Sequence, residues 1–216
     1  MRHLVTGAGS GIGRVLAERL LARGDEVWAV VRRPGRAPRG CVEVVADLAD
    51  AAAIESLREW PEAFDGLVHA AGVVELGPVA DLGARAWQEQ VAVNLVAPAL
   101  LTRAVLPQLR VAYGTVVFVN SGSGLRANPE WAAYAASKFG LRALADALRA
   151  EEPDLRVTSV FPGRTATAMQ EKVHRQEGRE YDAGRWIRPE TVAEVIVGVL
   201  DLSRDAQLPE VSVRPN

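Results

Sequence analysis

The chain of 216 residues has little of what metal centres, disulfides and nucleic-acid surfaces require. Cys41 is the only cysteine, so no internal disulfide and no cysteine zinc site is expected. His3, His69 and His174 lie far apart and without the spacing of metal ligands, so they are interpreted as structural or surface residues. The net charge is −2 with no dominant basic stripe, which argues against nucleic acid and anionic membranes as partners.

Targeting and membrane-spanning segments are also not expected. An apolar strand begins almost at Met1, which leaves no room for a signal peptide. No apolar run approaches the ~20 residues that span a bilayer. With 49% hydrophobic and 24% charged residues, the composition is that of a globular protein with a sizeable core. We expect one domain over residues 1–216 and a cytoplasmic location.

Strand-like apolar runs alternate with segments of helical periodicity along the chain. The expected strands are His3–Thr6, Glu26–Val31, Val42–Val45, Gly66–Ala70, Thr115–Asn120, Arg156–Phe161 and Val211–Arg214. The expected helices are Ile12–Arg23, Ala51–Glu59, Ala84–Arg110, Trp131–Ala150 and Pro189–Leu202, with Asp50 and Asp81 as caps and Pro189 in a first turn. This alternation predicts an α/β fold, a single-domain Rossmann-type doubly wound parallel sheet of about seven strands with helices on both faces.

A glycine-rich turn follows the first expected strand, in Thr6-Gly7-Ala8-Gly9-Ser10-Gly11-Ile12-Gly13. A strand, such a turn and a helix direct unpaired backbone amides and a positive dipole end at one spot, which suits a pyrophosphate. The spacing is neither G-x-G-x-x-G nor a P-loop, because residue 12 is Ile and no Gly-Lys-Ser/Thr follows. A tight turn without a ligand would not need four glycines in seven residues, so a dinucleotide is expected here.

The end of the second expected strand indicates which dinucleotide binds. An acidic residue about 20 residues beyond the glycines holds the ribose 2′-hydroxyl of NAD. This strand ends instead in Arg32 and Arg33, and two guanidinium groups suit a 2′-phosphate. NADP(H) is therefore expected in preference to NAD(H), the alternative being a solvated strand end.

Tyr134-Ala-Ala-Ser-Lys138 places a phenol and an ammonium four residues apart on an expected helix, and therefore on one face. A nearby cation favours ionisation of a phenol, whose ordinary pKa is about 10. Tyr134 would then exchange a proton near neutral pH. Alternatively, Tyr134 packs between helices, because its neighbours from Trp131 onward are apolar nearly all round.

Together these residues resemble the short-chain dehydrogenase/reductase family, in its compact single-domain branch, over essentially the whole chain. The family's landmarks occur in its order as the glycine turn, Asp47-Leu48, His69-Ala70-Ala71-Gly72, Asn94, Ser121 thirteen positions before Tyr134, Pro162-Gly163 and Thr167. The cofactor contacts that the resemblance implies are Gly7, Ser10, Gly11, Ile12, Gly13, Arg32, Arg33, Asp47, Leu48, His69, Ala70, Ala71, Gly72, Tyr134, Lys138, Pro162, Gly163, Thr165 and Thr167.

The resemblance also implies hydride transfer between a nicotinamide and a small carbonyl or alcohol substrate. Tyr134 would be the general acid/base, and Lys138 would lower its pKa and bind the nicotinamide ribose. Ser121 would donate a hydrogen bond to the substrate oxygen, although it also suits a turn cap. Asn94 would kink its helix and hold a water that links Lys138 to solvent, the alternative being a solvated helix residue.

Two departures from the family pattern concern binding. His69-Ala70 replaces Asn-Asn, which removes two amide side chains from the end of the fourth strand. The chain is also short between Thr167 and Pro189, so residues 168–188 are expected to form a lid over an unusually open pocket. The expected pocket residues are Ser123, Leu125, Trp131 and Met169, while Trp186 suits either the pocket or the core.

Two other functions remain open. A cofactor-binding regulator that senses NADPH would keep the fold without turnover, although all four catalytic positions are present. A nucleotide-sugar epimerase or dehydratase belongs to a longer branch of the family, for which the chain is too short. By analogy with the family, the helices over Ala84–Arg110 and Trp131–Ala150 would form a homodimer, which is often doubled into a homotetramer.

Overall fold

A seven-stranded parallel sheet in the order β3-β2-β1-β4-β5-β6-β7 forms the centre of the computed structural model, which describes all of residues 1–216. The strands are β1 (Arg2–Thr6), β2 (Glu26–Val31), β3 (Val42–Val45), β4 (Gly66–His69), β5 (Thr115–Val119), β6 (Arg156–Pro162) and β7 (Glu210–Val213). The chain runs outward from β1 to β3 and then returns to place β4 on the other side of β1. This reversal opens a crevice at the carboxyl ends of the central strands.

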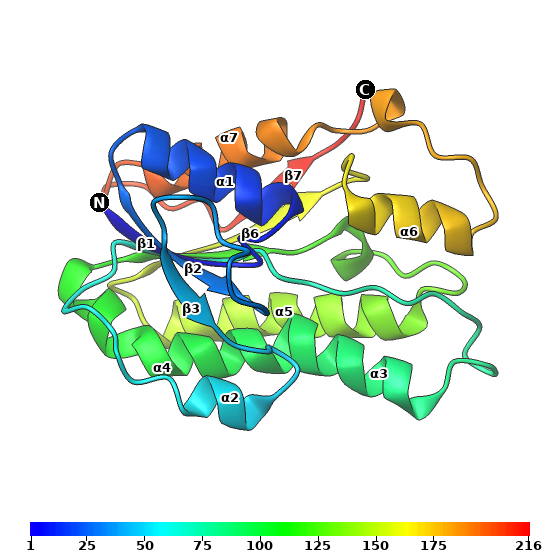
Figure 1. Cartoon of the computed structure of the whole chain (residues 1–216), viewed down its shortest axis with the longest axis horizontal. Helices are drawn as coiled ribbons and strands as arrows, with labels where there is room; N and C mark the ends of the chain where they lie inside the picture. Colours follow the sequence, from blue (N-terminus) through cyan, green and yellow to red (C-terminus); the bar gives the residue numbers. More distant parts are fainter.

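Helices cover both faces of the sheet (Figure 1). On one face lie α1 (Gly11–Ala22) and α7 (Pro189–Leu200), with α6 (Ala168–Gln176) beside them. On the other lie α2 (Ala51–Glu55), α3 (Ala84–Val91), α4 (Ala97–Ala112) and α5 (Ala132–Glu151). A π-helical turn, η1 (Ala92–Val96), joins α3 to α4, and two short 3-10 turns are η2 (Gly122–Gly124) and η3 (Ala183–Arg185).

Because helices cover both faces of the sheet, its central strands carry continuous apolar runs. Successive side chains of a strand point to opposite faces, so Leu4 packs with α4 and α5 while Val5 packs with α1 and α7. Val116 and Val117 divide in the same way in β5. Both faces need apolar side chains, which explains why these strands do not alternate with polar residues.

The predicted fold class is confirmed, and most element bounds agree to within two residues. The predicted cap Asp50 is confirmed, because its carboxylate accepts from the amides of Ala52 and Ala53 at 2.9 and 3.3 Å. The Asp81 cap is wrong, since Gly83 precedes α3. Helix α2 ends at Glu55 instead of residue 59, and helix α6 was not expected.

The helical stretch over Ala84–Ala112 corrects another expectation. It is 29 residues long and contains an 18-residue window with a mean hydropathy of 1.3, so by length and composition alone it could cross a membrane. Of that apolar window, 44% is buried inside the protein, and Leu101, Val105 and Leu109 of α4 are fully buried in the core. The apolar character of this helix therefore serves packing against the sheet.

Shortening Leu101 to alanine is expected to lower the free energy of unfolding by about 2–5 kcal/mol, because its side chain is fully buried. Val111→Ala on the same helix is the control, since Val111 is 60% exposed and the expected change is within about 0.5 kcal/mol. Urea unfolding measures both. Equal effects would contradict the packing of α4 described here.

Candidate active site

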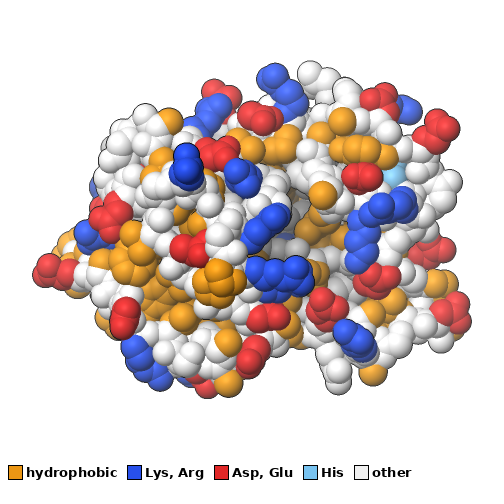
Figure 2. Space-filling model, viewed as in Figure 1, with side chains coloured by type: hydrophobic (Ala, Val, Ile, Leu, Met, Phe, Trp, Pro, Cys, Tyr) orange, Lys and Arg blue, Asp and Glu red, His pale blue; other side chains and the backbone are white.

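The carboxyl ends of the central strands open onto a cleft of about 1160 Å³. Figure 2 shows it as a hollow in the middle of the viewed face, with Lys and Arg side chains at its edge. The glycine turn lies at one end, and the ends of β5 and β6, together with α5 and α6, line the other. One cleft thus brings together the two motifs that the sequence placed far apart.

Three positions of the glycine turn require glycine, either for backbone conformation or for space. Gly7 and Gly11 have positive φ angles of 68° and 53°, which L side chains rarely adopt. A Cβ at Gly7 would lie 2.8 Å from the Ala71 Cα, and one at Gly13 would lie 2.6 Å from the Gly7 carbonyl oxygen. Gly13 itself does not line the cleft, so its function here is close packing.

The first turn of α1 is open to an anion. Ser10 precedes the helix in an extended conformation, and its side chain accepts no hydrogen bond from the first amides. No acidic residue lies in that turn, and Ser10, Gly11 and Ile12 line the cleft. Free amides and a positive dipole end therefore face the space that a pyrophosphate would need.

Arginines surround the cleft next to this turn. Arg32 and Arg33 line it as expected, together with Arg36, which the sequence analysis did not single out. The Glu43 carboxylate accepts from the amides of Gly35 and Ala37 at 2.9 and 3.0 Å and so holds the loop that carries Arg36. This end of the cleft suits a phosphate beyond the pyrophosphate.

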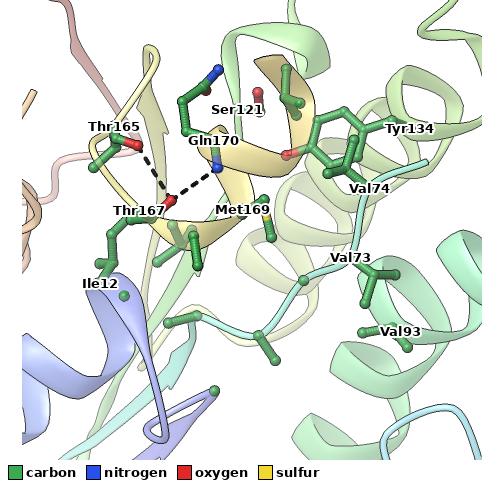
Figure 3. Close-up of a pocket in the computed structure, with 18 of the residues that line it drawn as sticks. Ile12, Val73, Val74, Val93, Ser121, Tyr134, Thr165, Thr167, Met169 and Gln170 are labelled. Carbon is green, nitrogen blue, oxygen red and sulfur yellow. Dashed lines mark hydrogen bonds between the residues drawn. The ribbon is translucent and has the colours of Figure 1, made fainter. Parts of the chain in front are cut away.

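Tyr134 and Lys138 share the inward face of α5, as their spacing predicts. Their exposed fractions are 7% and 3%, and the Lys138 Nζ lies 5.8 Å from the centre of the Tyr134 ring. The ammonium donates to the Val119 carbonyl at 3.0 Å. Figure 3 shows the Tyr134 hydroxyl directed into the space beside Ser121 and Met169. The side chain that carries the proton therefore faces the cleft.

Burial dominates the proton affinities of this pair. It raises the pKa of Tyr134, while the nearby Ser121 hydroxyl lowers it. Burial also lowers the pKa of Lys138 to about 8. The Tyr134 pKa is therefore not lowered toward neutral pH in the protein alone as predicted, because desolvation of the phenol outweighs the effects that favour its ionised form. Tyr134 is a neutral phenol at pH 7.

Ser121 lies at the carboxyl end of β5 and lines the cleft. Its hydroxyl accepts from the Ser123 amide at 3.1 Å, so it also caps η2, as the alternative interpretation proposed. The two functions are compatible, because the cap uses an oxygen lone pair and leaves the hydroxyl proton free.

Asn94 is fully buried within η1, where the helix is locally unwound as predicted. Its side chain accepts from the Val73 amide at 2.8 Å and donates to the Val73 carbonyl at 2.9 Å and to the Ser137 hydroxyl at 3.0 Å. The amide group thus ties the segment after β4 to α5. That Asn94 holds a water stays a prediction.

His69 does not line the cleft, so its inclusion among the expected cofactor contacts is wrong, whereas its interpretation as a structural residue is confirmed. The ring stacks on Phe118 with centroids 5.0 Å apart, and its Nε2 lies 2.9 Å from the Thr102 hydroxyl. Burial, together with the Lys138 charge, lowers its pKa to about 3, so the ring is neutral. The neighbouring Ala70, Ala71 and Gly72 do line the cleft.

The expected lid, residues 168–188, begins with helix α6 across the cleft from α5. Thr167 caps this helix by accepting from the Gln170 amide at 3.3 Å (Figure 3), and its methyl group would lie 3.4 Å from a Cβ at Gly11. At the other face of α6, the Lys172 ammonium donates to the Glu75 carboxylate at 2.6 Å. Helix α6 and its cap residue thus contact both the glycine turn and the segment after β4, and a lid function of residues 168–188 stays a prediction.

Most expected site residues line the cleft, but one of the four expected pocket residues, Leu125, does not, and neither does Trp186, for which the sequence leaves pocket and core open. The other three pocket residues, Ser123, Trp131 and Met169, line it. Trp186 instead packs against the Arg164 guanidinium at 5.4 Å. The expected cofactor contacts that line the cleft are Gly7, Ser10, Gly11, Ile12, Arg32, Arg33, Asp47, Leu48, Ala70, Ala71, Gly72, Tyr134, Lys138, Pro162, Gly163, Thr165 and Thr167.

The cleft also contains residues that the sequence analysis missed. They include Arg36, Val73, Val74, Val93, Asn120, Arg164, Gln170, Val173, Glu177 and Arg179. The valines come from the segment after β4, from η1 and from α6, but single apolar residues give no signal that separates pocket from core. Asn120 directly precedes Ser121, and this adjacency is the sequence signal that could have identified it as a site residue.

Lys138 is expected to titrate near pH 8 instead of 10.5, because its ammonium is desolvated. Lys138 and Lys172 are the only lysines, so NMR of protein labelled with 13C-lysine gives two side-chain signals, and Lys172→Arg assigns them. Because the pKa is lowered in the folded chain, Lys138 adds to stability as pH rises from about 8 toward 10.5. Two signals that both titrate near 10.5 would contradict this burial.

Comparisons with known proteins agree with the geometry. The family profile described as short chain dehydrogenase matches residues 2–178. The uncharacterized oxidoreductase YciK of Escherichia coli is 34% identical over 191 residues, which cover 77% of this chain and 74% of that protein. The closed form of serine dehydrogenase complexed with NADP+ superposes with a TM-score of 0.86 at 25% identity, covering 99% and 94% of the two chains.

A second solved structure, 4-hydroxyisoleucine dehydrogenase complexed with NADH, has a TM-score of 0.83 at 27% identity and covers 100% of this chain and 97% of that one. The cleft, the order of its motifs and these similarities have one explanation. The chain belongs to the short-chain dehydrogenase/reductase family of oxidoreductases.

Proposed function

We propose that the protein is an NADP(H)-dependent oxidoreductase that transfers a hydride between nicotinamide and a small carbonyl or alcohol substrate, with Tyr134 as the general acid/base. The observation that carries this proposal is the convergence of Tyr134, Ser121 and Lys138 on the cleft that also contains the glycine turn. A proton donor, a hydrogen-bond donor and an anion site thus lie in one space, as carbonyl reduction requires.

The residues present are suited to a nicotinamide dinucleotide. The open amides of α1 and the cleft-lining part of the glycine turn, from Gly7 to Ile12, would hold the pyrophosphate. Arg32, Arg33 and Arg36 add three positive charges at the same end of the cleft and support NADP(H) over NAD(H). Similar structures carry NADP+ or NADH, so the preference rests on these arginines.

The proton chemistry follows from burial. When bound, the nicotinamide supplies or accepts the hydride. Tyr134 is protonated at neutral pH and would donate its proton to the substrate oxygen during reduction, while the Ser121 hydroxyl holds that oxygen. Lys138 is charged below about pH 8 and would stabilise the phenolate that Tyr134 leaves behind. A protonated Tyr134 beside a charged Lys138 favours reduction near neutral pH.

The substrate end of the cleft is mainly apolar near Tyr134. Trp131 packs against the Tyr134 ring at 5.7 Å, and Val74 and Met169 lie nearby (Figure 3). Such a lining supports a small carbonyl compound with an apolar body. The regulator alternative keeps the same cofactor site but requires no turnover, so kinetics separates the two.

The protein is also proposed to form a homodimer or homotetramer through α4 and α5. Phe139 and Val96 are 42% and 39% exposed on this helical layer. Apolar side chains of this size on neighbouring helices support association of two copies. A cytoplasmic location stays a proposal.

Turnover is expected with NADPH and a panel of ketones and aldehydes, and Tyr134→Phe is expected to lower kcat by on the order of 10²-fold or more. Reduction should slow and alcohol oxidation should accelerate as pH rises, because oxidation needs the phenolate of a residue whose pKa is raised. Absorbance at 340 nm measures both directions. Full activity of Tyr134→Phe would show that another group carries the proton.

NADPH is expected to bind more tightly than NADH, and replacing Arg32, Arg33 and Arg36 with glutamine should remove the difference. Fluorescence titration of the nicotinamide gives both dissociation constants without any substrate. Arg19→Gln is the control, because it removes an arginine of α1 that lies outside the cleft. It should leave the ratio of the NADPH and NADH dissociation constants unchanged. Equal affinities in the unmodified protein would remove the basis for the NADP(H) assignment.

A further inference from the structure

Asn120 occupies the junction between β5 and η2, directly before Ser121. Its exposed fraction is 4%, and its backbone amide donates to the Val160 carbonyl at 2.7 Å, so its main chain continues the pairing of β5 with β6. A buried amide side chain is costly unless both its polar groups are paired. The partners of this side chain therefore indicate what it does.

Both partners belong to the proposed catalytic group. The Asn120 Oδ1 accepts from the Ser121 amide at 2.8 Å. The Asn120 Nδ2 donates to the Lys138 carbonyl of α5 at 3.1 Å. One side chain thus links the main chain of Ser121 to the helix that carries Tyr134 and Lys138.

Lys138 is held from two sides by consecutive residues. Its ammonium donates to the Val119 carbonyl at 3.0 Å, and its own carbonyl accepts from Asn120. The end of β5 therefore fixes both the position of α5 and the direction of the Lys138 side chain. Ser121 is the next residue, so the Asn120 hydrogen bonds to the Ser121 amide and the Lys138 carbonyl also set its distance from Tyr134 on α5.

Gly124 shows that the space for this amide is closely limited. A Cβ at Gly124 would overlap the Asn120 Oδ1 and would lie 3.0 Å from the Lys138 carbonyl oxygen. The φ angle of Gly124 is not positive, so glycine is needed here for space and not for backbone conformation. The amide, the glycine and the helix carbonyl form one packed unit.

We propose that Asn120 is a positioning residue, which holds Ser121 and α5 at the separation that proton transfer from Tyr134 requires. The inference rests on the proposed function, because it concerns the geometry of that reaction. It acts through its two hydrogen bonds and requires no contact with the substrate. Its role needs a donor toward Lys138 and an acceptor toward Ser121 at the same time.

Asn120→Asp tests that requirement with nearly the same shape. An ionised carboxylate still accepts from Ser121 but places an acceptor against the Lys138 carbonyl, whereas the protonated acid can donate to it. The variant is therefore expected to show an added ionisation, with kcat near that of the unmodified protein at acidic pH and reduced on the order of tenfold or more above it. KM for NADPH should stay within about twofold.

Gly124→Ala disturbs the same unit without adding a charge. It should lower kcat to a similar extent at every pH, because the new methyl group displaces the Asn120 amide. Gly198→Ala on α7 is the control, since a Cβ there meets nothing within 4 Å. A pH–kcat profile of Asn120→Asp parallel to that of the unmodified protein would overturn the inference, as would full activity of Gly124→Ala.

A readout without turnover separates this inference from the proposed function. In Asn120→Ala, NMR should show faster hydrogen exchange at the Ser121 amide, because its acceptor is lost, and NADPH binding should be retained. Unchanged exchange would overturn the link whether or not turnover is found. Failure of the unmodified protein to turn over any carbonyl would remove the proposed function, while the exchange measurement still decides whether Asn120 holds Ser121.

Discussion

The packing of α5 against the end of β5 is the constraint on which the candidate site depends. This contact buries the Lys138 ammonium, which has no ion-pair partner and donates to the Val119 carbonyl at 3.0 Å. Burial also raises the pKa of Tyr134, whose phenol is protonated at neutral pH even without burial. Desolvation therefore opposes formation of the phenolate that the proposed reaction would leave behind.

The glycine turn shows the same dependence on close packing at the other end of the cleft. Gly7 approaches Ala71 of the segment after β4, and Gly13 approaches the carbonyl of Gly7. The strand, the turn and the helix are therefore too close for any side chain, which leaves the α1 amides uncovered. An anion site and a tightly packed crossover are two consequences of one geometry.

The fold and the main site residues were predictable because their signals are local. Apolar runs that alternate with helical segments predict a parallel sheet, and the spacing of four positions from Tyr134 to Lys138 places the two side chains on one helix face. Asp50 capped its helix as expected because capping involves only neighbouring residues. His69 could not be placed from sequence, because whether its ring turns toward the cleft or toward Phe118 and Thr102 depends on tertiary packing.

The direction of the Tyr134 pKa shift escaped prediction for a related reason. A charge four residues away is visible in the sequence, but the desolvation of a phenol is set by residues from α6 and the segment after β4 that pack around it. Val74 and Val173 contribute to that enclosure from distant parts of the chain. Burial opposes the charged forms of both groups, so it raises the pKa of the phenol and lowers that of the amine. Burial therefore reverses the ordinary order of the two pKa values, because the pKa of the Lys138 amine now lies below that of the Tyr134 phenol. The protonated phenol is the form from which reduction would start.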